Sequence, residues 1–138
     1  MTRPSPDVSW ESRAFWGGGE RGQLMIHRCH ACGGWFHPPA PACYRCRSTD
    51  VRPEAASGRA TVVAFTINEH QWLASFPPPY VIAIVELADD PSVRLTTNIV
   101  GCEPAAVHIG MSVEVEFDQA AADVWVPIFH PVVPQAAS

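Results

Sequence analysis

The sequence has no lysine. All nine of its basic residues are arginines, set against 14 aspartates and glutamates, so the formal net charge is −5. The shortage of positive charge is concentrated in residues 58–138, where two arginines face nine acidic residues (−7), while residues 1–57 hold seven arginines and five acidic residues (+2). An acidic surface repels a phosphate backbone. Residues 58–138 are therefore not expected to form a basic groove for nucleic acid.

Long apolar runs are also missing. No run approaches the roughly 18–20 residues that a helix needs to span a bilayer, and residues 1–8 are polar and proline-rich, unlike a signal peptide. We therefore expect a cytoplasmic protein with no membrane partner. In that compartment paired cysteines bind metal more often than they form disulfides. Hydrophobic residues make up 47% of the chain and charged residues 17%, which indicates a packed globular protein.

The motifs of common active sites are absent as well. There is no G-x-S-x-G, no glycine-rich phosphate loop and no H-E-x-x-H. Glu114 and Glu116 share one face of an expected strand, where a solvated pair is more common than an acid–base pair. Cys102 follows apolar residues and has no basic neighbour, so we interpret it as a small hydrophobic residue. No catalytic residue is predicted.

Two cysteine pairs are the strongest positive signal. Cys29 and Cys32 form one pair, Cys43 and Cys46 the other, each with two intervening residues, and ten residues separate the pairs. The two-residue spacing lets a tight turn direct both sulfurs at one ion, and Gly33 can adopt the positive φ that such a turn often needs. Four thiolates in a tetrahedron favour Zn²⁺, with a single iron as the alternative. A closed four-sulfur shell leaves no position for water, so we predict one structural zinc ion.

Other polar residues surround the cysteines. Because four thiols are available, His27, His30 and His37 are expected at the surface or beside the ligands rather than on the metal. Arg45 and Arg47 adjoin the second pair. They could meet CoA phosphates or partner carboxylates, although solvated arginines are the more frequent case.

A short amphipathic helix is expected near the start of the chain, with Ser9 as its N-cap. Its apolar residues would be Trp10, Ala14 and Phe15. The glycines at 17–19 should end it, and a second short helical turn could follow before the next strand.

The rest of the chain has the texture of strands. Leu24–Arg28 and residues 47–57 are interpreted as strands that enter and leave the cysteine module. After Gly58 come five runs rich in Val, Ile, Thr and aromatic residues. These runs are Ala60–Glu69, Val81–Leu87, Val93–Val100, Val113–Asp118 and Val124–His130. Residues 88–91 are expected to form a hairpin connection, and one helical turn could lie within residues 104–108.

This order predicts a mainly β protein with a short N-terminal helix, a rubredoxin-like zinc ribbon and a five-stranded barrel of the oligonucleotide/oligosaccharide-binding (OB) type. An immunoglobulin-like sandwich is the alternative, but it needs about seven strands. The expected divisions are a leader with the short helix at 1–23, the zinc ribbon at 24–57, the barrel at 58–131 and a tail at 132–138.

With these features in this order, the chain resembles the acyl-CoA-associated zinc-ribbon/OB-fold proteins, catalogued as domain of unknown function thirty-five. The resemblance extends from about residue 10 to 131. It rests on Phe15-Trp16, Arg21–Leu24, Arg28–Gly33, Phe36–Pro39, Cys43–Cys46, Ser57–Val62, Pro79–Ala83, Leu95–Val100, Ile109–Met111 and Val126–Pro131. The second cysteine pair departs from the family's frequent Cys-Pro-x-Cys, with the cysteines kept, and the triple glycine is unusual.

The resemblance implies a non-catalytic subunit that docks on a thiolase-fold acyl-CoA enzyme such as a thiolase, an acyltransferase or a steroid side-chain aldolase. Such a subunit stabilises the enzyme in a hetero-oligomer and helps to shape the passage for the acyl-CoA at the interface. Two alternatives remain: a nucleic-acid-binding zinc-ribbon/OB module, and a stand-alone thioester enzyme that uses His70 or His108.

Large aromatic residues are numerous for so small a barrel. They either pack the ribbon against the barrel or lie exposed for a partner. They are Trp10, Phe15, Trp16, Trp35, Phe36, Trp72, Phe76, Tyr80, Trp125 and Phe129. The loop from Glu69 to Pro79 is the first candidate for a partner or ligand contact.

Overall fold

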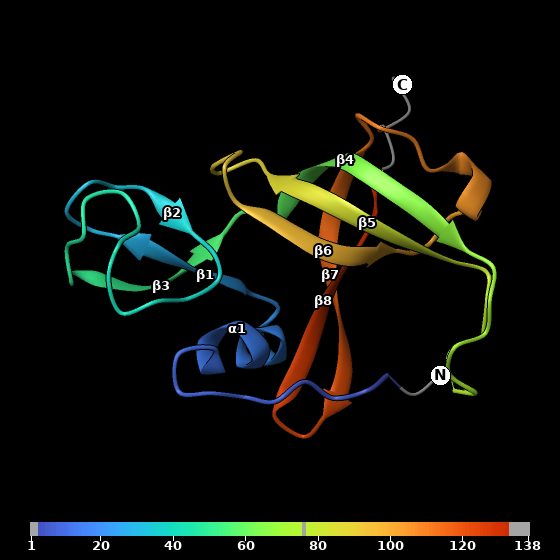
Figure 1. Cartoon of the computed structure of the whole chain (residues 1–138), viewed down its shortest axis with the longest axis horizontal. Coiled ribbons are helices and arrows are strands. Elements are labelled where there is room, and N and C mark those ends of the chain that lie inside the picture. Colours follow the sequence, from blue (N-terminus) through green and yellow to red (C-terminus); the bar gives the residue numbers. More distant parts are fainter. Residues whose placement is uncertain (1–2, 76, 133–138) are drawn as a thin grey trace.

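The computed structural model describes residues 3–75 and 77–132. Phe76 and positions 133–138 of the expected tail lie outside the described residues. A three-stranded sheet stands beside a five-stranded closed barrel, and a short helix lies between them (Figure 1). The predicted fold class is confirmed, and the immunoglobulin-like alternative is wrong because the barrel has five strands. No helix in the described ranges is long and apolar enough to cross a membrane.

The first helix begins later than expected. Helix α1 spans Arg13–Gly17 with Ser12 as its N-cap, and the 3₁₀ helix η1 follows at once over Gly18–Arg21. Ser9 is therefore not the N-cap. Its hydroxyl accepts a hydrogen bond from the Ser12 N–H, and the Ser12 hydroxyl accepts one from the Ser9 N–H, so the two serines close a separate turn ahead of the helix.

The ribbon sheet consists of β1 (Leu24–Cys29), β2 (Trp35–Phe36) and β3 (Val51–Ala56) in the order β2-β1-β3, with both pairings antiparallel. The strands predicted to enter and leave the cysteine module are thus β1 and β3. Few buried apolar residues support this part of the chain. Its own small core contains Cys29, Phe36 and Cys43. So small a core needs another source of stability, such as a metal.

All five predicted barrel strands are present. They are β4 (Arg59–Asn68), β5 (Tyr80–Leu87), β6 (Arg94–Ile99), β7 (Ser112–Ala121) and β8 (Val124–Pro131), in the barrel order β4-β5-β6-β8-β7. The predicted turn between β6 and β7 is the 3₁₀ helix η2 (Pro104–Ala106). The hairpin expected at residues 88–91 joins β5 to β6.

The barrel core is mainly aliphatic, and the short helix extends it toward the ribbon. Val62, Val85, Val113 and Phe129 are fully buried inside the barrel. Phe15 from α1 and Leu24 and Ile26 from β1 belong to the same buried cluster. The ribbon and the barrel therefore share a core, so the ribbon does not hang from the barrel on a free linker.

The barrel closes unevenly. Strands β7 and β8 pair along most of their length, but β6 meets β8 in a parallel contact at a single pair, Ile99 with Phe129. Beyond this pair the two strands separate. The Thr97 hydroxyl, donating to the carbonyl of Pro127 at 3.0 Å, spans the widening seam.

Candidate metal centre and neighbouring surfaces

The two cysteine pairs form matching turns. In the first, the Gly33 N–H donates to the Cys29 carbonyl at 2.9 Å, and in the second the Arg47 N–H donates to the Cys43 carbonyl at 3.0 Å. Gly33 has a φ of +80° and Arg47 a φ of +63°. Gly33 was expected to adopt this conformation. The left-handed arginine at the equivalent position was not, because the sequence rule relies on glycine.

The structure brings all four predicted cysteines together. Their sulfur atoms lie within 4.8 Å of one another. The Sγ atoms of Cys29 and Cys46 are 3.5 Å apart, and those of Cys32 and Cys43 are 3.8 Å apart. A tetrahedron with Zn–S bonds of about 2.3 Å has sulfurs separated by about 3.8 Å. The four side chains therefore fit the dimensions of a Zn²⁺ site.

The shifted pKa values of the thiols also favour binding of a cation. Backbone N–H groups of Cys46 and Arg45 lower the pKa of Cys43 to about 6, and the Cys32 N–H lowers the pKa of Cys29. The Ser48 N–H acts in the same direction on Cys46, but the adjacent sulfurs, Cys29 first, outweigh it and raise its pKa to about 11. The turns thus favour some thiolates while crowding opposes the rest. A divalent cation at the centre would relieve that repulsion.

The three neighbouring histidines do not join this cluster. Among the described residues, the group able to hold a metal consists of the four cysteines alone. The His27 ring lies 5.7 Å from that of Phe36, and His30 Nε2 is 3.6 Å from a Glu54 carboxylate oxygen. His37 packs against the ring of Phe15, with centroids 4.7 Å apart. His30 is exposed and His27 half-buried beside the ribbon, in line with the expectation for both. His37 differs from it, because its ring is drawn in against the helix.

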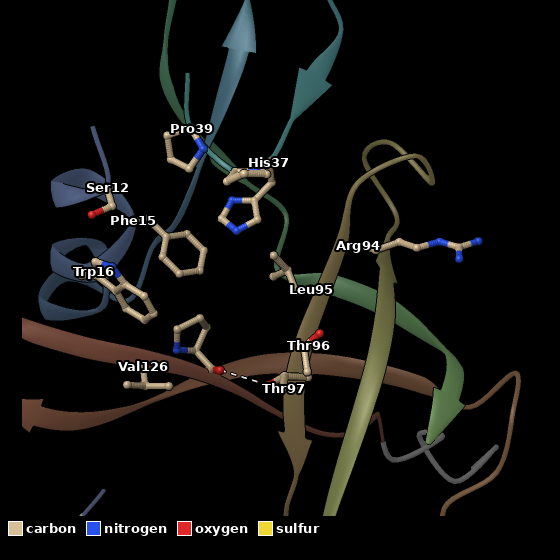
Figure 2. A pocket seen from close by; sticks show the side chains of 12 residues that line it. Ser12, Phe15, Trp16, His37, Pro39, Arg94, Leu95, Thr96, Thr97 and Val126 are labelled. Atoms are coloured by element: carbon tan, nitrogen blue, oxygen red, sulfur yellow. Dashed lines mark hydrogen bonds between the residues drawn. The ribbon is translucent and has the colours of Figure 1, made fainter. Parts of the chain in front are cut away.

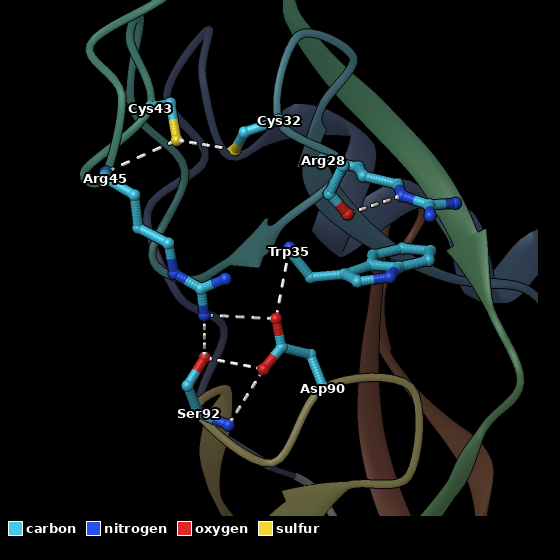
Figure 3. A network of polar contacts seen from close by, with 8 residues as sticks. Arg28, Cys32, Trp35, Cys43, Arg45, Asp90 and Ser92 are labelled. Atoms are coloured by element: carbon cyan, nitrogen blue, oxygen red, sulfur yellow. Dashed lines mark hydrogen bonds and ion pairs between the residues drawn. The ribbon is translucent and has the colours of Figure 1, made fainter.

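Arg45 ties the second cysteine turn to the barrel (Figure 3). Its N–H donates to Cys43 Sγ at 3.4 Å, and its guanidinium donates to Asp90 at 3.2 Å and to the Ser92 hydroxyl at 2.6 Å. Asp90 also accepts the Trp35 N–H at 3.3 Å. From the sequence, Arg45 was considered as a contact for CoA phosphates or partner carboxylates. Its contact with Asp90 was not predicted, because residues 45 and 90 are brought together only by tertiary structure.

A cavity of about 430 Å³ lies where helix, ribbon and barrel meet. Figure 2 shows the His37 ring pointing into it, with Phe15 and Trp16 on one side and Leu95 on the other. Burial lowers the pKa of His37 to about 4, so the imidazole is neutral at pH 7. Its Nδ1 is buried without a hydrogen-bond partner in the described structure. No sequence pattern predicted this cavity.

The aromatic residues divide between core and surface. Phe15, Trp35, Phe36 and Phe129 are buried. Trp10 and Trp72 are 78% and 71% exposed, and Leu73 beside Trp72 is 45% exposed. The aromatic set is therefore split, and Trp16, Tyr80 and Trp125 are half-buried between these two groups. Trp72 lies on the predicted contact loop, held by its Nε1–H bond to the Asn68 side chain at 2.9 Å.

The histidines considered for thioester chemistry are not set up for it. His70 is exposed and stacks edge-on against Trp72, with ring centroids 4.3 Å apart. His108 is exposed, and its Nδ1 is 3.2 Å from the Ala106 carbonyl. Neither histidine forms a hydrogen bond to a carboxylate or a thiol in the described part of the chain. Cys102 packs beside the barrel core, as predicted.

Comparison with known proteins places this architecture in a family. Residues 16–52 match the ChsH2 rubredoxin-like zinc ribbon domain, and residues 53–118 match the ChsH2 C-terminal OB-fold domain. A DUF35 domain-containing scaffold protein of Methanocaldococcus jannaschii is 36% identical over 107 residues, which are 75% of this chain and 74% of the relative. The chain belongs to the ChsH2/DUF35 family. The resemblance noted from the sequence is confirmed.

Larger relatives contain this DUF35 unit as a part. A probable enoyl-CoA hydratase alpha subunit of Thermomonospora curvata is 35% identical over 99% of the chain. A 3-oxo-4,17-pregnadiene-20-carboxyl-CoA hydratase alpha subunit of Mycobacterium tuberculosis is 35% identical over 92% of it. The chain spans 42% and 40% of the length of these two relatives.

Solved structures agree with the assignment. A chain of the Ltp2-ChsH2(DUF35) aldolase superimposes with a TM-score of 0.81 at 36% identity, covering 93% of this chain and 99% of that one. A DUF35 protein from Sulfolobus solfataricus, 17% identical, has a TM-score of 0.62 over 91% of this chain and 87% of its own, which shows the shared fold.

Proposed function

We propose that the chain is a non-catalytic, zinc-containing subunit that docks on a thiolase-fold acyl-CoA enzyme, stabilises it and helps to shape the acyl-CoA passage. The observation that carries this proposal is the likeness to a chain of the Ltp2-ChsH2(DUF35) aldolase over 99% of that chain's length. Two further relatives are hydratase alpha subunits, and another is a scaffold protein. The names of these relatives describe subunits or scaffolds, which are parts of larger assemblies.

We further propose that Cys29, Cys32, Cys43 and Cys46 hold one Zn²⁺. The spacing of their sulfurs and the small ribbon core support this. Bound zinc would supply four strong bonds that replace a hydrophobic core, and a saturated shell of four thiolates has no open position for water or substrate. The metal would therefore hold the ribbon in shape and take no part in chemistry.

The non-catalytic role is supported by what the described residues do not assemble. Four of the five thiols belong to one metal-sized cluster, and the fifth, Cys102, packs beside the barrel core. The candidate histidines His70 and His108 are exposed, and the two candidate glutamates lie apart from them on β7. General acid–base or nucleophilic catalysis needs such groups within hydrogen-bond reach of one another. The acyl-CoA chemistry is accordingly assigned to the partner.

The loop around Trp72 is our proposed contact surface. Trp72 and Leu73 place two large apolar side chains in solvent, and such residues are frequent anchors of protein interfaces. The Nε1–H bond to Asn68 and the His70 ring hold Trp72 in place, so less side-chain entropy is lost on binding.

Co-expression tests the proposal. The chain should co-purify with a thiolase-fold enzyme encoded nearby in the same genome, with one equivalent of zinc per chain and no colour from iron. The variant Trp72→Ala should weaken the complex about tenfold or more, since buried tryptophan anchors contribute roughly 2 kcal/mol or more. CoA release by the isolated chain, lost in His70→Ala or His108→Ala, would instead support a stand-alone thioester enzyme.

A further inference from the structure

Strand β6 has a free edge beside the junction cavity. On one side it pairs with β5 from Arg94 to Ile99, and on the other it meets β8 only at Ile99. Arg94 to Thr97 therefore has no strand on its second side within residues 3–75 and 77–132. This stretch is about 13 Å of extended chain. The barrel seam is open along it.

The hydrogen-bond alternation shows which backbone groups are free. The Leu87 N–H on β5 donates to the Val93 carbonyl, just before β6. Backbone groups along an antiparallel strand alternate between its two sides, so those of Leu95 and Thr97 also face β5. The backbone groups of Arg94 and Thr96 therefore face the seam. The Val100 N–H, in phase with these two, donates across the seam to the Phe129 carbonyl at 2.8 Å. Arg94 and Thr96 thus each present an N–H and a carbonyl toward an absent strand.

Strand β8 cannot supply these partners. The residue opposite the open stretch is Pro127, which has no N–H, and its carbonyl is already taken by the Thr97 hydroxyl. A further strand can therefore be added without breaking an existing ladder. Unpaired edges of this kind are the templates used for strand addition in peptide recognition.

The cavity beside this edge limits what can enter. Phe15, Trp16 and Val126 contribute apolar walls, and about 430 Å³ is enough for one or two large side chains (Figure 2). The walls carry no uncompensated charge: the guanidinium of Arg94 lies 2.8 Å from Glu86, and burial keeps His37 neutral. A charged side chain would lose its hydration there without a counter-charge. The walls therefore complement an uncharged, apolar side chain.

We propose that an extended segment of the partner enzyme adds as a strand to the free edge of β6 and inserts an uncharged apolar side chain into the cavity between Phe15, Trp16 and His37. The segment would bond the backbone groups of Arg94 and Thr96. This inference rests on the proposed function, because the segment is assigned to the thiolase-fold partner.

Hydrogen exchange of the intact complex tests the proposal. In the free chain the amides of Arg94 and Thr96 should exchange rapidly, whereas those of Leu95 and Thr97 are already protected by β5. In the complex with the co-purified thiolase-fold enzyme, the Arg94 and Thr96 amides should exchange at least tenfold more slowly. When exchange is measured by fragmentation at single-residue resolution, slowing at every second amide distinguishes strand addition from general burial.

Thr96→Pro provides a second measurement. It removes the outward N–H that β5 does not use, and edge strands tolerate proline at such positions. The variant should keep its zinc and its circular-dichroism spectrum but bind the enzyme at least tenfold more weakly, whereas the matched variant Thr96→Ala, which retains the N–H, should bind within twofold of the natural chain. If Thr96→Pro fails to fold, the exchange pattern decides.

The outcomes separate the two proposals. A complex in which the Arg94 and Thr96 amides exchange as before, or to which Thr96→Pro binds normally, overturns the strand addition and leaves the docking role intact. Such a result would also fit a small apolar molecule in the cavity. Failure of the chain to bind any thiolase-fold enzyme contradicts both proposals.

Discussion

At the scale of single residues, the two cysteine turns use the same backbone geometry with different side chains. Gly33 and Arg47 occupy equivalent left-handed positions, which glycine adopts at no steric cost and other residues adopt at roughly 1–2 kcal/mol. Nothing lies within 4 Å of a Cβ added at Gly33, so conformation alone sets the effect of a substitution there.

Two substitutions should therefore have different effects on stability. Gly33→Ala should lower the free energy of unfolding by about 1 kcal/mol, while Arg47→Gly should leave it unchanged or raise it slightly, because relief of strain opposes the larger entropy of the unfolded chain. Urea titration of the zinc-loaded protein measures both. Equal destabilisation by the two changes would show that the turns are not equivalent.

His37 should make stability depend on pH. Its pKa is lowered to about 4 in the folded chain from an ordinary value near 6.5, so the unfolded state binds the proton more readily. The stabilisation is complete above about pH 6.5 and is lost as the pH falls toward 4. Allowing for partial exposure, the loss should be about 1–2 kcal/mol.

The matched variant for this effect is His37→Phe, which keeps a ring against Phe15 and cannot titrate. Thermal unfolding of both proteins between pH 7 and pH 4.5 isolates the contribution of His37, because any loss of zinc at low pH affects both alike. Parallel stability curves would mean that the imidazole is not buried as the structure has it.

Whether a functional residue could be predicted depends on how far apart in the sequence its contacts lie. The four cysteines were identified because their chemistry is encoded in two local spacings. The bond from Arg45 to Asp90 and the burial of His37 were missed, because both depend on how the ribbon packs on the barrel. No local pattern records contacts between residues so far apart.

At the scale of elements, the glycines at the end of the first helix and in η1 have different structural roles. A Cβ at Gly19 would collide with Trp125 and Phe117, so this glycine lets η1 approach β7 and β8 closely. A Cβ at Gly17 meets nothing within 4 Å. Within the unusual triple glycine, Gly19 thus serves the packing of η1 on the barrel, whereas Gly17 has no such role.

Two alanine substitutions separate these roles. Gly19→Ala should lower the free energy of unfolding by about 1–3 kcal/mol through overpacking, and Gly17→Ala should raise it by up to about 1 kcal/mol because alanine favours the helix. Thermal melts of the two variants suffice to compare them. A harmless Gly19→Ala would place η1 farther from the barrel than described.

Removal of zinc should affect the ribbon before the barrel. The ribbon has a small core of its own, whereas the barrel has a large aliphatic core. After chelation at neutral pH, amides of β1 near Cys29 and of β2 should lose protection from exchange by at least tenfold, while those of β5 should stay protected. Loss of protection throughout the barrel would show that metal and barrel fold as one unit.

Elements were more predictable than their ends. The runs rich in Val, Ile, Thr and aromatic residues identified all five barrel strands, because strand propensity is a local property. The N-cap was misplaced by three residues, since Ser9 and Ser12 both have capping side chains and only the fold selects between them. The open edge of β6 could not be foreseen, because strand order in the barrel is not written in any one segment.

At the scale of the whole molecule, three features support the proposed docking role. A compact ribbon is fixed to an acidic barrel by a shared core and by the Arg45–Asp90 contact. The surface carries an exposed tryptophan loop and an open strand edge. Relatives in which the same unit forms part of a longer hydratase subunit are consistent with a module that works in assemblies.

We propose that the chain acts through a thiolase-fold enzyme and performs no acyl-CoA chemistry alone. The direct test is to titrate the purified chain into a fixed concentration of that enzyme and follow acyl-CoA turnover. We expect no turnover by the chain alone. Enzyme activity or half-life should rise with added chain and saturate at a fixed stoichiometry. Turnover by the chain alone would rule out this role, as would enzyme activity and half-life that do not change when the chain is added.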